Sequence, residues 1–207
     1  LLKAAMAEEL KEIDQITSQK AEPNFENTIA ALQRSGLAFD RVSTVYETWT
    51  GSMSTPKLQK IETEMAPLLA AHADKIAQNS KLFQRIEAVK NSPEHKKLNP
   101  EQQRLVLVLH NKFVLDGAKL SGKDKSKLAK INQELSKLST KFSQNLLGDE
   151  EKDYLVISDK KELVGLPQFI VDGAIAEAKR LGKKGKWIVA NTRSYIEPLL
   201  MYSPNRA

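Results

Sequence analysis

The sequence predicts a mainly α-helical protein, a multi-helix bundle or wall, with one small two-stranded antiparallel β element in its C-terminal part. Apolar residues recur at spacings of three and four through most of residues 1–147, as on the buried face of a helix. Only two short runs, at residues 154–157 and 186–190, are rich in β-branched and aromatic residues. The 207 residues are 41% hydrophobic and 28% charged, which is ordinary for a globular protein with a real core.

Residues 1–147 predict about six helices joined by short loops. The first carries one apolar stripe through Ile16 and ends before Pro23. Asn24, Thr55 with Pro56, and Asn99 with Pro100 are typical helix starts. The helix that begins at Asn24 is expected to continue well past Gly36, with these side chains inward: Ile29, Leu32, Leu37, Val42, Val45 and Trp49.

The last helix of this part is long and rich in lysine. Ser121 caps it, Gly148 is expected to end it, and residues 149–153 are expected to be a polar linker. One face carries an apolar stripe of Leu128, Ile131, Leu135, Leu138, Phe142 and Leu146. The sequence therefore predicts a helical domain over residues 1–147 and a mixed segment over residues 148–207 that packs on it.

The mixed segment is expected to hold two strands, 154–157 and 186–190. Asp159 and Glu162 form a capping box for one helical turn, and a helix over about 168–181 ends at Gly182. A short helix follows near the C-terminus. Because lone strands leave backbone groups unpaired, we expect the two strands to pair antiparallel and to pack on helices.

The charge is uneven along the chain. Residues 1–92 hold 11 Lys and Arg against 12 Asp and Glu, whereas residues 93–207 hold 21 against 14. One interpretation is a stand-alone basic helical module that binds nucleic acid or an acidic protein. The basic residues are mostly Lys, and no nucleic-acid recognition motif accompanies them, so we expect a solvated helix face and no nucleic-acid partner.

No residue of the chain is predicted to be catalytic, to bind a cofactor or to bind a metal. The chain has no Cys, and His72, His95 and His110 lack the i, i+4 pairing of a helix-borne zinc site. We expect His72 to be a core or groove histidine, His95 to be solvated and His110 to be half-buried. Purified chain should therefore hold no stoichiometric zinc.

Other candidate groups also favour structural roles. No nucleophile elbow occurs, and residues 182–186 lack the phosphate-loop spacing, which indicates a turn. The carboxylates at 62, 64, 150 and 151 are expected on helix surfaces, because adjacent positions do not make a facing acid–base pair. Tyr195 and Tyr202 either line a peptide channel or pack against the strand at Trp187, and packing is favoured.

No apolar run approaches the roughly 18–20 residues that span a bilayer, so no membrane partner is expected. The first residue is not Met, and we expect a missing upstream segment, a signal peptide among the possibilities. The absence of Cys fits either the cytoplasm or the periplasm.

Several sequence blocks, in order, resemble the thimet-oligopeptidase-like zinc metallopeptidases and, within them, the peptidyl-dipeptidase Dcp branch. These blocks are Pro23–Ile29 with Gly36, Ser54–Gln59, Glu64–His72, Asn79–Ile86, Gly117–Pro167, Trp187–Val189 and Met201–Arg206. The resemblance covers nearly the whole chain and only the N-terminal portion of such an enzyme.

The resemblance implies a helical, clam-shaped enzyme with a channel that admits short peptides. The family binds zinc through an H-E-x-x-H helix and a downstream Glu, all expected beyond Ala207, and its Dcp branch releases C-terminal dipeptides. This chain would be a non-catalytic channel wall, and its two segments would belong to one half of the enzyme. Expected partners are the missing catalytic half and short peptides. The chain by itself is expected to be inactive and to self-associate through apolar residues such as Leu199–Tyr202.

Overall fold

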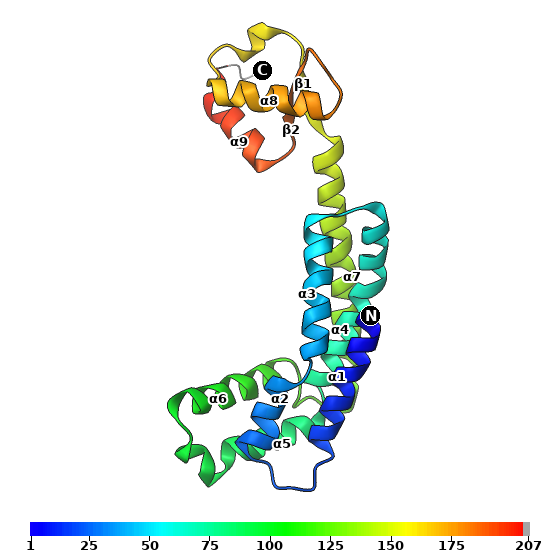
Figure 1. The fold of residues 1–207 in the computed structure, drawn as a ribbon, viewed down its shortest axis with the longest axis vertical. Helices are drawn as coiled ribbons and strands as arrows, with labels where there is room; N and C mark the ends of the chain where they lie inside the picture. The colour runs from blue at the N-terminus through cyan, green and yellow to red at the C-terminus, as the bar shows by residue number, and fades with distance from the viewer. Residues whose placement is uncertain (205–207) are drawn as a thin grey trace. The chain divides into compact units, whose positions relative to one another are not determined.

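The computed structural model describes residues 1–204, and two compact units divide the chain at Thr140 and Lys141. The first unit is helical. It contains α1 (Leu2–Thr17), η1 (Phe25–Ala30), α2 (Ala31–Arg34), α3 (Leu37–Ser52), α4 (Pro56–Ala77), α5 (Ser80–Asn91), η2 (Pro93–Lys97), α6 (Pro100–Leu115) and the first part of α7 (Gly122–Lys152) (Figure 1).

The predicted helix starts are confirmed. The side chains of Asn24, Thr55 and Asn99 each accept the backbone N–H three residues on. Ser121 Oγ accepts the N–H of Asp124 in the same way. These caps replace partners that the first turn of a helix otherwise lacks, and therefore fix where each helix begins.

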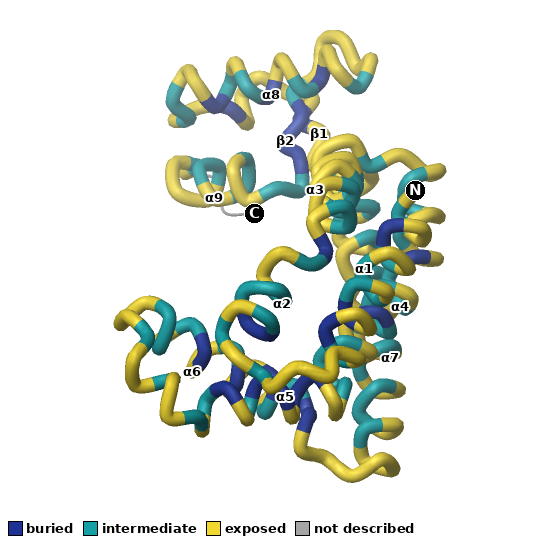
Figure 2. The backbone as a smooth tube through the Cα atoms, turned by 60° about the horizontal axis from the view of Figure 1, so that its bottom comes forward, coloured by how far each residue is buried: buried dark blue, intermediate teal, exposed yellow. Residues whose placement is uncertain are grey.

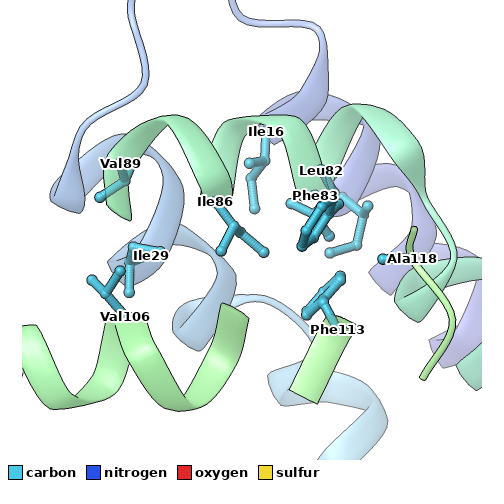
Figure 3. Packing of buried hydrophobic residues seen from close by; sticks show 10 residues of the cluster. Ile16, Ile29, Leu82, Phe83, Ile86, Val89, Val106, Phe113 and Ala118 are labelled. Atoms are coloured by element: carbon cyan, nitrogen blue, oxygen red, sulfur yellow. The ribbon is translucent and has the colours of Figure 1, made fainter. Parts of the chain in front are cut away.

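The core of the first unit is built around α5. Leu82 and Ile86 of α5 are fully buried; Figure 3 shows Phe83 of α5 facing Phe113 of α6, and Val106 of α6 beside Ile29 of η1. The same cluster includes Ile13 and Ile16 of α1, Ile29 of η1, Val89 of α5 and Ala118. Each buried aliphatic side chain of this kind contributes roughly 1.5–3 kcal/mol, so this cluster is a major source of stability in the unit.

The expectation of one helix from Asn24 past Gly36 is wrong. Gly36 has φ +77°, and its N–H donates to Glu12 Oε2 of α1 at 2.7 Å, so α3 starts in a new direction. Only glycine adopts this backbone region at little cost. Leu37, Val45 and Trp49 are consequently about half exposed rather than inward, and α3 has no buried residue (Figure 2).

Gly148 does not end α7, and residues 149–152 are helical rather than a linker. A terminating glycine adopts positive φ just past the last turn, and Gly148 does not. A glycine inside a helix costs only about 1 kcal/mol, so the helix continues. Its apolar stripe is not buried: Ile131, Leu135, Leu138, Phe142 and Leu146 are each at least half exposed.

The second unit confirms the predicted β element. β1 (Tyr154–Ile157) pairs antiparallel with β2 (Trp187–Ala190), and η3 (Lys160–Leu163) and α8 (Gln168–Arg180) connect them; α9 (Arg193–Tyr202) follows. Asp159 and Glu162 form the expected capping box. A small cluster that includes Ile157, Leu163 and Val189 packs the strands onto helices. Within residues 1–204, no helix has the length and apolar character needed to cross a membrane.

Candidate functional site

A groove of about 600 Å³ lies on α4 in the first unit and is called the α4 groove below. Its walls come from α1, α3, α4, α6 and the start of α7. Its lining residues are Glu9, Phe39, Glu47, Leu69, His72, Ala73, Asp74, Ile76, Ala77, Lys112, Phe113, Leu115, Asp116, Leu128 and Asn132. Its volume is in the range of small-molecule sites, which are mostly apolar with a few placed polar groups.

His72 lines this groove and is almost completely buried, which confirms the expectation of a core or groove histidine. Its Nε2 lies 2.6 Å from Glu9 Oε2, and the Phe39 ring packs against it with ring centroids 5.0 Å apart. Nε2 therefore donates to the carboxylate. Nδ1 is enclosed and has no hydrogen-bond partner among residues 1–204.

Asp74 is a second buried polar residue of the groove, and the sequence analysis did not single it out. Its Oδ1 accepts from Gln78 Nε2 at 3.2 Å and from Asn132 Nδ2 of α7 at 2.7 Å. Its Oδ2 is buried without a hydrogen-bond partner in the described part of the chain. Asp74 lies about 100° from Ala73 and 200° from Ile76 around α4, so it is off the apolar stripe. Its burial comes from contact with α7, which no local sequence signal indicates.

The groove carries more negative than positive charge. Four carboxylates line it, and Lys112 is bonded to one of them, with Nζ 2.7 Å from Asp116 Oδ2. Tyr46 lies next to Glu47 on α3. Burial raises the pKa of Tyr46 most, and the carboxylates of Glu62 and Glu47 raise it further. The groove is therefore suited to a cation rather than an anion.

His110 is buried, not half-buried as expected, because Phe83 of α5 covers it with ring centroids 5.4 Å apart. Lys90 Nζ lies 3.2 Å from its Nδ1, and Glu87 Oε1 lies 3.6 Å from its Nε2. A hydrogen bond from Lys119 is the main reason that the pKa of Glu87 is below its ordinary value. This cluster is an interhelical contact around a core ring.

His95 is half-buried rather than solvated, because the turn Pro93–Lys97 folds back on α5 and encloses its Nε2. The three histidines thus lie on three separate elements. Within residues 1–204, no three His, Cys, Asp or Glu side chains are grouped so that they could hold a metal ion. The described residues do not fit a zinc site, which needs three or four converging ligands.

The remaining candidates lie on helices and turns. Tyr195 packs with Trp187 in the core of the second unit, as expected. Tyr202 does not: it is half-exposed and lies edge-to-face on Phe169 of α8. Gly182 and Gly185 both have positive φ, which confirms the turn over residues 182–186. Of the four candidate carboxylates, two lie on α4 (Glu62 and Glu64) and two lie on α7 (Glu150 and Glu151).

The family profile and the individual relatives that match this chain point to the same family. The sequence profile described as "Neurolysin/Thimet oligopeptidase, N-terminal domain" matches residues 2–125. "Dipeptidyl carboxypeptidase" of Escherichia coli (strain K12) is 34% identical over 98% of this chain and 30% of its own length. "Probable cytosolic oligopeptidase A" of Arabidopsis thaliana is 29% identical over 95% of this chain and 29% of its own length.

"Oligopeptidase A" of Haemophilus influenzae is 27% identical over 94% of this chain and 28% of its own length. The chain thus spans less than a third of the length of these relatives, and matches their N-terminal part. These matches confirm the resemblance drawn from the sequence blocks, including that to the peptidyl-dipeptidases. The chain therefore belongs to the neurolysin/thimet oligopeptidase N-terminal domain family.

Proposed function

We propose that this chain is the non-catalytic N-terminal portion of a zinc metallopeptidase that releases C-terminal dipeptides from short peptides. In this proposal it forms one wall of the substrate channel, and its two segments belong to one half of the enzyme. The zinc ligands and the group that activates water lie elsewhere in the polypeptide. We expect the enzyme to act in the cytoplasm or the periplasm.

The observation that carries the proposal is the match to "Dipeptidyl carboxypeptidase" over 98% of this chain, together with the family profile. The misfit of the described histidines to a metal site supports a wall rather than a catalytic role for this portion. The expectation of an inactive chain rests on the same misfit.

Exposed apolar side chains support contact with further protein. Trp49 of α3 is 55% exposed, Phe142 of α7 is 69% exposed and Met201 of α9 is 73% exposed, and each has further exposed apolar neighbours on its helix. Apolar surface gathered in this way usually marks an interaction site. In this proposal, the catalytic portion of the enzyme covers part of it.

The test compares the polypeptide of the complete reading frame with residues 1–207 alone. Both are incubated with a short N-terminally blocked peptide, and products are identified by mass spectrometry. We expect the complete polypeptide to release C-terminal dipeptides, to lose activity with a chelator and to regain it with zinc. Residues 1–207 should release nothing and hold no stoichiometric zinc.

Three results would contradict the proposal in whole or in part. One tightly bound zinc per chain of residues 1–207, or hydrolysis by that chain, would place a catalytic centre within it. A complete polypeptide that cleaves no peptide at any zinc concentration would remove the peptidase assignment. Internal cleavage without dipeptide release would retain a peptidase and reject the proposed release of C-terminal dipeptides.

A further inference from the structure

We propose that the α4 groove binds an organic cation carried on an apolar stem, of the kind that an arginine side chain presents. The inference starts from two buried polar atoms of residues that line the groove, Asp74 Oδ2 and His72 Nδ1. Neither atom has a hydrogen-bond partner in residues 1–204. A buried acceptor without a donor is costly, and a ligand that donates to it recovers that cost.

The arrangement of α4 separates the two atoms. Successive residues of a helix are about 100° apart, so His72 and Asp74 lie on either side of Ala73. Leu69, Ala73 and Ile76 therefore form an apolar strip between two polar edges. One edge meets α1 through Glu9, and the other meets α7 through Asn132.

The charges of the edges select a cation. Glu9 accepts a hydrogen bond from His72, and Asp116 forms an ion pair with Lys112. The bonds to Asp74 come from two neutral amides, which leave its charge uncompensated. Like Asp74, Glu47 forms no ion pair with any of the described residues. Two carboxylates thus face the groove without a cation.

The apolar lining selects the rest of the ligand. Phe39, Phe113 and Leu128 stand beside the strip on α4, so a ligand with an aliphatic stem buries apolar surface there. A bare metal ion does not fit, because no described group of three ligands converges. A guanidinium presents five N–H donors and no acceptor, and it donates to Asp74 Oδ2.

His72 Nδ1 suits the other end of such a ligand. Nε2 donates its hydrogen to Glu9, so Nδ1 carries no hydrogen in the neutral form of the ring and then accepts. It can receive an N–H, such as the backbone amide of an arginine residue. The groove thus offers a carboxylate for the cation, an apolar strip for the stem and an acceptor for an amide.

The probe is N-acetyl-arginine N-methylamide, added to residues 1–207 and followed by NMR shifts of the backbone amides of α4. The matched probe is the citrulline analogue, which has the same shape and no charge. We expect saturable binding of the arginine probe, weaker by about tenfold or more for citrulline, since a charge-assisted hydrogen bond has that effect. The shifts should centre on Ala73 and Ala77.

Variants locate the site. Asp74→Asn should weaken binding about tenfold or more, and Glu47→Gln should weaken it severalfold. Ala73→Phe keeps every charge and should abolish binding by filling the groove. Because Asp74 is buried and bonded, Glu47→Gln and Ala73→Phe, at exposed positions, keep the test decisive if Asp74→Asn unfolds. Glu101→Gln, on α6 and outside the groove, is the control and should change nothing.

Equal binding of arginine and citrulline, or of a norleucine analogue, would overturn the proposal and indicate an apolar docking face. Absence of saturable binding, or binding unaffected by Ala73→Phe, would also overturn it. No peptidase activity enters the measurement, so its failure would leave the proposed function unaffected.

Discussion

Asn27 connects the start of the first unit to its core, and its replacement by Ala should destabilise that unit strongly. Its Oδ1 accepts the N–H of Asn24 at 2.9 Å and a bond from Arg85 Nη2 of α5 at 3.0 Å. Its Nδ2 donates to the carbonyl of Glu22 at 2.8 Å. Arg85 is buried, and burial is the main cause that lowers its pKa, so it depends on such partners.

The magnitude follows from these bonds. The two bonds to the backbone contribute about 1 kcal/mol each, and the bond from the charged Arg85 about 1.5–3 kcal/mol. Water replaces part of this at a half-buried position, so Asn27→Ala should lower the free energy of unfolding by about 2–4 kcal/mol. The midpoint of thermal unfolding should fall by about 5–12 °C.

Urea and thermal unfolding followed by far-UV circular dichroism measure this change. The control is Asn91→Ala, an exposed position on α5, which should stay within about 0.5 kcal/mol. A double-mutant cycle of Asn27→Ala with Arg85→Met should give a coupling of about 1–3 kcal/mol. If Asn27→Ala behaves like Asn91→Ala, or costs the same with and without Arg85, the reasoning is refuted.

Three further predictions concern glycines, a carboxylate and an exposed stripe. Gly148→Ala should stabilise α7 by about 0.5–1 kcal/mol, whereas Gly36→Ala should destabilise the first unit by about 1–2 kcal/mol because Gly36 has positive φ. If both variants change the free energy of urea unfolding in the same direction, this prediction is wrong. Lys119→Gln should raise the pKa of Glu87 in a carboxyl-carbon NMR titration, because the hydrogen bond from Lys119 is the main cause that lowers it. The stabilisation from this pair is present above the pKa of Glu87 in the unfolded chain and is lost as pH falls through its pKa in the folded chain. An unchanged pKa of Glu87 would reject the assignment. The isolated chain should self-associate in sedimentation analysis, and Leu138→Gln with Phe142→Gln should reduce association by removing exposed apolar surface; a monomer at all concentrations would contradict this.

Local features of the fold were predictable because local chemistry determines them. The caps at Asn24, Thr55 and Asn99 and the antiparallel strands all follow from residues close in sequence or from unpaired backbone groups. The break at Gly36 was missed because its positive φ is stabilised by Glu12, 24 residues away. A local pattern does not contain that bond.

The α4 groove was only partly predictable for the same reason. His72 was recognised as a core or groove residue, but Asp74 meets Asn132 across 58 residues of chain. Periodicity also overestimated burial on α7, because an apolar stripe shows that a face can be covered without showing what covers it. The proposed contact with a catalytic portion would explain why α7 carries an apolar stripe that is exposed in this chain.

Complementation in trans tests the central claim most directly. The catalytic portion of the same polypeptide is made without residues 1–207, and this chain is added at increasing ratios while release of C-terminal dipeptides is measured. We predict a saturable increase in peptidase activity above that of the catalytic portion alone, smaller with the Leu138→Gln and Phe142→Gln variant. No gain at any ratio, with both parts folded, would contradict the claim that this chain is a wall of the enzyme.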